Sequence, residues 1–124
     1  MYVPLNFFQK RSITMKTIYR QGDVLLELVA AIPQGAKDVT AGDRIVLAYG
    51  EATGHAHAVH EPLTKKTPKG RAKLWDAGAE RFLQILEKTA LRHEEHADVP
   101  LQPGIYRVTT QREYNPKEIR RVSD

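Results

Sequence analysis

The chain has 124 residues, a net charge of +4 and no cysteine, and this length is typical of one small domain. The lack of cysteine excludes disulfides, iron–sulfur clusters and thiolate zinc sites, and no apolar run approaches the ~20 residues that span a bilayer. We therefore expect a cytoplasmic protein. Four of the 19 basic residues lie in 1–22, a stretch without acids, so 15 basic and 15 acidic residues remain. That balance argues against a broad nucleic-acid-binding face.

The first 15 residues, "MYVPLNFFQKRSITM", differ in composition from the rest of the chain. They lack the apolar segment and the small-residue cleavage site of a secretory signal, and only faintly suit an organellar transit peptide. We predict a flexible N-terminal extension at 1–15, with Met15 as an alternative start of translation. Residues 16–124 are then expected to form a single β-rich domain.

Short apolar runs with turn residues between them follow this segment. "GDVLLELV" (22–29) and "GDRIVLAYG" (42–50) each open with Gly-Asp, and we expect two strands entered by similar turns. The stretch 32–43 carries Pro, Gly and Asp and is predicted to be a loop. The stretch 51–59 alternates like a strand after Gly54.

The second half of the chain continues this pattern. Residues 60–78 are interpreted as a long polar connection, and 81–88 as a strand, because no helix N-cap precedes "RFLQILEK". Residues 99–114 suggest a strand, a Pro-Gly turn and a second strand. Asn115 can cap a short C-terminal helix that begins at Pro116. The expected fold is mainly β, a small antiparallel barrel or sandwich, with that terminal helix.

All five histidines fall into two short clusters, "GHAHAVHEP" (54–62) and "LRHEEHAD" (91–98). In a strand, His55 and His57 would share one face and could reach one metal ion, whereas His60 would point away. His93 and His96 would share a face in a helix but not in an extended segment. The carboxylates between them, Glu94 and Glu95, could ligate, act as a general base or orient an imidazole. Solvated surface histidines and carboxylates are the alternative interpretation.

The stretch "GEATGHAHAVHE" resembles the first motif of the cupins. Gly50, His55, His57 and Glu61 match its glycine, its HxH pair and its glutamate, although the spacing before His55 is one residue short. In cupins these side chains bind a divalent metal inside a β-barrel, with a further histidine from a second motif. In this chain Arg107 occupies the place expected for that histidine, so His93 or His96 would have to replace it.

A broader resemblance covers most of residues 19–124. The stretches "YRQGDVLL", "GEATGHAHAV", "HEEHADVPLQPGIYRVTTQREY" and "RRVSD" are similar to a group of small uncharacterised bacterial and phage-encoded proteins. The resemblance implies the boundaries of a domain and no chemistry.

Other catalytic patterns are missing from the sequence. The only serines, Ser12 and Ser123, lie in the tails, and no glycine-rich phosphate loop is present. A basic stretch, "KKTPKGRAK" (65–73), could contact nucleic-acid phosphates or could be a solvated loop. Its basic side chains belong to Lys65, Lys66, Lys69, Arg71 and Lys73.

The leading hypothesis is a small cupin-like protein that binds a divalent metal. His55 and His57 would be joined by His93 or His96, with Glu61 as a fourth ligand, and such a thiolate-free set suits Fe, Mn, Ni or Zn. An enzyme acting on a small molecule would require open coordination positions, and the sequence assigns no catalytic residue. The alternatives are a non-catalytic module, phage or mobile-element associated, that binds protein or nucleic acid, and a structural domain with a pH-sensitive histidine patch.

Overall fold

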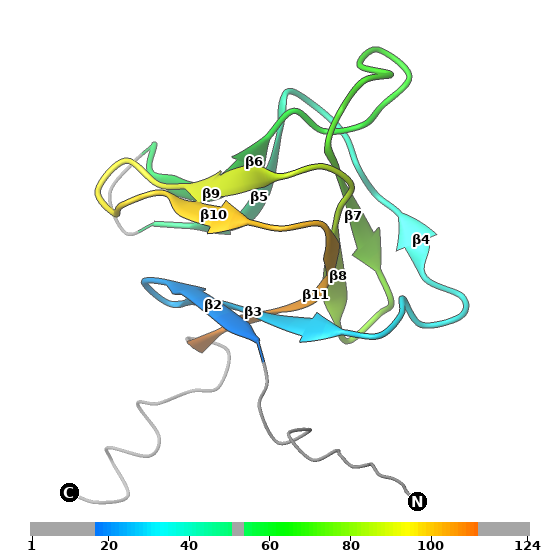
Figure 1. Ribbon diagram of the computed structural model, residues 1–124, viewed down its shortest axis with the longest axis horizontal. Coiled ribbons are helices and arrows are strands. Elements are labelled where there is room, and N and C mark those ends of the chain that lie inside the picture. The colour runs from blue at the N-terminus through cyan, green and yellow to red at the C-terminus, as the bar shows by residue number, and fades with distance from the viewer. Residues whose placement is uncertain (1–16, 51–53, 112–124) are drawn as a thin grey trace, which may run out of the picture.

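The computed structural model describes residues 17–50 and 54–111, which form two antiparallel sheets (Figure 1). The smaller sheet has the order β10-β9-β6-β5, with strands Val99–Leu101, Thr89–Arg92, Ala56–His60 and Arg44–Tyr49. The larger sheet has the order β2-β3-β11-β8-β7-β4. Its strands are Ile18–Gln21, Val24–Val29, Gly104–Thr110, Arg81–Ile85, Ala72–Asp76 and Lys37–Asp38.

Several strands bury every second side chain, because successive residues of a strand point to opposite faces and one face of each sheet is buried. In β3, Val24 and Leu26 are fully buried, whereas Leu25 between them and Glu27 after them are half-buried. β5 buries Ile45 and Leu47 in the same way. These faces meet in one core to which both sheets contribute. Burial of such side chains, at roughly 1.5–3 kcal/mol each, is the main force that joins the two sheets.

The expectation of a mainly β fold is confirmed, but the barrel alternative is wrong for the described residues. Two separate sheets are present, and each ends in edge strands: β10 and β5 in one sheet, β2 and β4 in the other. The strands predicted near 22–29, 42–50, 81–88 and 99–114 are found at β3, β5, β8 and the β10–β11 pair.

The prediction that residues 60–78 form a polar connection is wrong at its C-terminal end. β7 lies within this stretch and pairs with β8 over five residues, from Ala72 opposite Ile85 to Asp76 opposite Arg81. Ala72 is fully buried and Leu74 packs against the core, so a short alternating segment forms a strand despite its polar neighbours. β4, a two-residue strand, also lies within the predicted loop 32–43.

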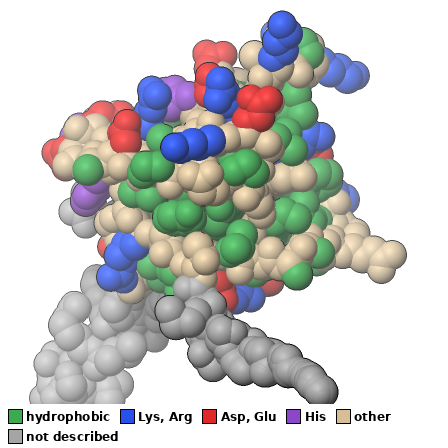
Figure 2. Space-filling model, viewed as in Figure 1, with side chains coloured by type: hydrophobic (Ala, Val, Ile, Leu, Met, Phe, Trp, Pro, Cys, Tyr) green, Lys and Arg blue, Asp and Glu red, His purple; other side chains and the backbone are tan. Residues whose placement is uncertain are grey.

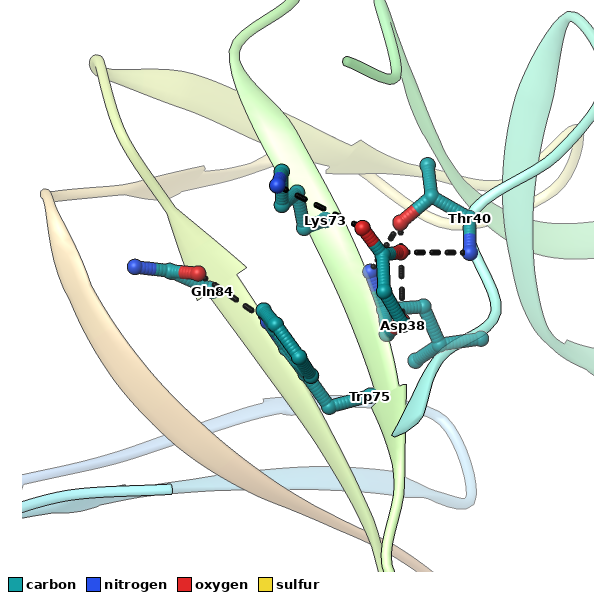
Figure 3. A network of polar contacts seen from close by, with 6 residues as sticks. Asp38, Thr40, Lys73, Trp75 and Gln84 are labelled. Carbon is teal, nitrogen blue, oxygen red and sulfur yellow. Dashed lines mark hydrogen bonds and ion pairs between the residues drawn. The ribbon is translucent and has the colours of Figure 1, made fainter. Parts of the chain in front are cut away.

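A polar network closes the edge of the larger sheet, where β4 pairs with β7 (Figure 3). Asp38 accepts a hydrogen bond from the backbone N–H of Thr40 and lies 3.3 Å from Lys73 Nζ. Partial burial raises the pKa of Asp38, but the hydrogen bonds from Thr40 and Lys73 outweigh it and hold the pKa below its usual value. Beside them Trp75 donates from its indole N–H to Gln84. The network holds the short edge strand β4 against β7.

Two predicted features, the extension at 1–15 and the helix that begins at Pro116, lie outside the described residues. Within 17–50 and 54–111, no helix has the length and apolar character required to cross a membrane.

Three parts of the chain converge at one end of the molecule, at the left of Figure 1. They are the β2–β3 turn, the adjoining ends of β5 and β6, and the loop between β9 and β10. The first belongs to the larger sheet and the other two to the smaller one. Side chains from both sheets can therefore meet at this end.

Candidate metal centre

The two histidine clusters come together at this end of the molecule. The ring centroids of His57 and His93 are 4.3 Å apart, those of His93 and His96 are 4.6 Å apart, and those of His57 and His96 are 5.6 Å apart. Each of the three rings offers a nitrogen, and these three nitrogens all lie within 4.8 Å of one another. Histidine side chains reach the surface at this end of the molecule (Figure 2).

His57 is the buried member of the cluster, and Gln21 fixes its orientation. The side chain is 4% exposed, and its Nδ1 lies 2.9 Å from Gln21 Oε1 on β2 of the opposite sheet. The Gln21 amide nitrogen donates to the backbone carbonyls of Leu91 and Ala97, each at 2.9 Å. The oxygen of Gln21 must therefore face His57, whose Nδ1 carries the proton. The neutral ring then has its lone pair on Nε2, the arrangement that a metal-ligating histidine requires.

His93 has the opposite arrangement of protons. The backbone N–H of Glu95 donates to His93 Nδ1 at 3.0 Å, so a neutral His93 carries its proton on Nε2. Ligation through Nδ1 would displace the Glu95 N–H, and ligation through Nε2 would move a proton to Nδ1. Metal binding through either nitrogen of His93 therefore breaks this hydrogen bond and requires an adjustment at Glu95.

A second group shares His93 with the first. His55, His93 and Glu94 also offer three ligand atoms within 4.8 Å of one another. Glu94 Oε1 accepts a hydrogen bond from the Ala56 backbone N–H at 2.9 Å. The pKa of Glu94 is lowered by this hydrogen bond, by a second one from its own backbone N–H, and by the positive charge of His55 and His93 when they are protonated. Glu94 therefore stays ionised near neutral pH and can neutralise part of a cation's charge.

His55 contributes a nitrogen that lacks a hydrogen-bond partner among the described residues. Its Nδ1 is buried, and a carboxylate oxygen of Glu95 lies 3.6 Å away, outside hydrogen-bonding distance. A buried polar atom without a partner is costly. A ligand bound between His55, His93 and Glu94 would remove this cost, so the donor set fits a cation.

Two glycines allow the rings to approach the backbone. A Cβ on Gly50 would lie 2.9 Å from His93 Nε2, and one on Gly22 would lie 2.9 Å from His96 Nε2. Gly22 also has a φ of +57°, which L residues rarely adopt. Any larger residue at either position would occupy space that the histidine rings now fill.

We expect Gly50→Ala to weaken divalent-metal binding by about tenfold or more, because the new methyl group would push His93 away from His57. Titration of metal-free protein with Zn²⁺ measures this change. Gly35→Ala is the control: a Cβ there meets no atom, although its φ of +91° is unfavourable for alanine. This control should lower thermal stability and leave metal affinity unchanged, and equal metal affinities in the two variants would contradict the assignment.

The remaining predicted site residues lie elsewhere. Glu61 has a φ of 65° and pairs with Arg71, with 3.3 Å between its Oε1 and Arg71 Nε, and it belongs to neither group. His60 lines the outer surface of β6 together with Ala56 and Ala58, whereas His57 points between the sheets. Glu61, which the cupin resemblance implies as a ligand, is therefore absent from both groups, and His55 and His57 belong to different groups.

The basic stretch 65–73 is divided in the structure. Arg71 pairs with Glu61 and Glu87, and Lys73 pairs with Asp38. Lys65, Lys66 and Lys69 stay exposed on the connection between β6 and β7, which projects from the molecule (Figure 2). Three exposed lysines form a smaller basic patch than the sequence suggests.

Sequence reasoning missed the role of Gln21. Its position directly before the Gly22-Asp23 turn is a weak signal, because a polar residue near a turn is usually solvated. Its contacts with His57, Leu91 and Ala97 span 36, 70 and 76 residues along the chain. Only the packing of the two sheets brings these residues together.

The fold and site define a small two-sheet β protein with a histidine cluster where both sheets meet. The chain belongs to a family described as a domain of unknown function (DUF8820), whose model matches residues 20–111. This membership agrees with the predicted resemblance to a small uncharacterised group, and the family model brings no cupin relationship. The comparisons with curated proteins and with solved structures found no match.

Proposed function

We propose that the protein binds one divalent metal ion through His57, His93 and His96, with Glu94 and His55 on the other side of His93. The observation that supports this most directly is the group of three imidazole nitrogens within 4.8 Å of one another, drawn from two segments distant in sequence. The proton on His57 Nδ1, fixed by Gln21, adds support because it directs the Nε2 lone pair toward a ligand.

The donor set favours a borderline metal. Three imidazoles with carboxylates nearby and no thiolate suit Zn(II), Fe(II), Ni(II) or Mn(II) better than Ca(II) or Mg(II), which prefer oxygen ligands. Three protein ligands leave coordination positions for water or a substrate, so a bound metal would supply Lewis-acid chemistry there. The chain's own contribution is to orient His57 through Gln21 and to hold Glu94 ionised.

Elemental analysis of protein purified without a polyhistidine tag tests the proposal. We expect about one equivalent of a transition metal per chain, or recovery of one equivalent when protein treated with a chelator is dialysed against Zn²⁺. Uptake well below one equivalent in both experiments would contradict the proposal, and the histidines would then require a structural explanation.

A further inference from the structure

A groove lies on the outer face of the smaller sheet, next to the histidine cluster. It has a volume of about 330 Å³, and Ala56 and Ala58 of β6 form its floor. Because alanine is small, the larger side chains of the adjoining strands stand above this floor on both sides. His93 and Glu94, which belong to the candidate metal centre, line the groove as well.

Basic side chains from three adjacent strands surround one part of this groove. Arg44 of β5 is directly opposite His60 of β6, and Arg92 of β9 is directly opposite Ala58. All four residues line the groove. The register of the sheet therefore places two guanidinium groups and an imidazole around the same small floor.

Within the described part of the chain these positive charges are only partly compensated, by Asp98 and Glu94 in the same groove. Arg44 is half-buried and forms no ion pair with any acid of the described residues. Arg92 Nε lies 3.9 Å from Asp98 Oδ2, but both side chains are more than half exposed, so that contact contributes little. Guanidinium groups bind carboxylates and phosphates through paired hydrogen bonds.

We propose that this groove binds a small organic molecule through one carboxylate or phosphate group, which lies between Arg44 and Arg92. The rest of the ligand extends toward His93 and Glu94. The carboxylates of Glu94 and Asp98 would repel a second anionic group, so the ligand carries its negative charge at one end. The ligand's role as the substrate or co-ligand of a bound metal rests on the proposed function. Anion binding in the groove does not depend on that function.

Nitrogen-15 NMR titration of chelator-treated full-length protein tests the groove, with acetate and inorganic phosphate as separate probes. We expect saturable shifts of the amides of Ala58, His60 and Arg92 with at least one probe, and the stronger probe identifies the anionic group. Arg44→Gln and Arg92→Gln should each weaken binding by about tenfold or more. Arg20→Gln, on β2 of the other sheet, removes the same charge and should change affinity less than twofold.

The outcomes separate this proposal from the metal proposal. Anion binding that is lost in Arg44→Gln and retained in Arg20→Gln supports the groove, whether or not a metal binds. Equal losses in both variants, or no saturable shifts near the groove with either probe, overturn it even if the chain takes up one equivalent of metal. The effect of His96→Ala provides a further check, because it should abolish metal binding and leave anion affinity in the metal-free protein unchanged.

Discussion

His57→Ala is expected to abolish the thermal stabilisation that a divalent metal gives this protein. A ligand present at about 100 times its Kd and bound to the native state alone adds about 2.7 kcal/mol to the free energy of unfolding. For a domain of this size that corresponds to a rise in Tm of about 10 °C or more. His57→Ala also leaves Gln21 Oε1 without this buried donor, which affects the Tm of the metal-free protein as well. The measurement is therefore the difference in Tm with and without Zn²⁺ for each variant.

Two further variants make this prediction specific. His96 is exposed, so His96→Ala should remove the metal-induced rise in Tm and leave the Tm of the metal-free protein nearly unchanged. His60→Ala, on the outer face of β6, should retain the full rise. A full rise in His57→Ala and in His96→Ala would show that the metal binds elsewhere.

Gln21→Leu is expected to destabilise the metal-free protein by about 3 kcal/mol or more. The substitution roughly conserves volume but removes three hydrogen bonds, two of them to the backbone carbonyls of Leu91 and Ala97. Each buried group left without a partner costs about 1–3 kcal/mol. Urea denaturation followed by Trp75 fluorescence measures the change.

The control for this variant is Gln84→Leu. Gln84 accepts one hydrogen bond, from the Trp75 indole at a partly buried position, and its loss should cost about 1 kcal/mol. Similar losses in the two variants would show that Gln21 is an ordinary strand residue rather than the group that joins the larger sheet to His57 and the smaller sheet.

Short runs of strand-forming residues that are bounded by turn residues predict β3, β5 and β11. Within each of these strands, buried positions alternate with more exposed ones. β7 is not predicted because only two of its residues contribute to the core, the buried Ala72 and the partly buried Leu74, and both lie beside basic residues. Two core positions do not distinguish a strand from a loop until the neighbouring β8 supplies its partners.

The meeting of the two histidine clusters agrees with the hypothesis drawn from their grouping in the sequence. The sequence could not predict which residues form each group of possible metal ligands, because "HEEH" forms neither a helix nor a strand. His93 and His96 approach each other because the chain turns between β9 and β10. Glu94 replaces Glu61 near the histidines for the same reason: the loop turns its carboxylate toward the Ala56 N–H.

The order of the strands has a consequence for how the site can assemble during folding. His57 lies on β6 and His93 directly follows β9, and these strands are neighbours in the smaller sheet. The chain between β6 and β9 crosses to the larger sheet, where it forms β7 and β8. The contact between these histidines therefore joins residues far apart in the sequence, and such contacts form slowly. A bound metal would thus act on late steps of folding, and it would slow unfolding more than it would speed folding.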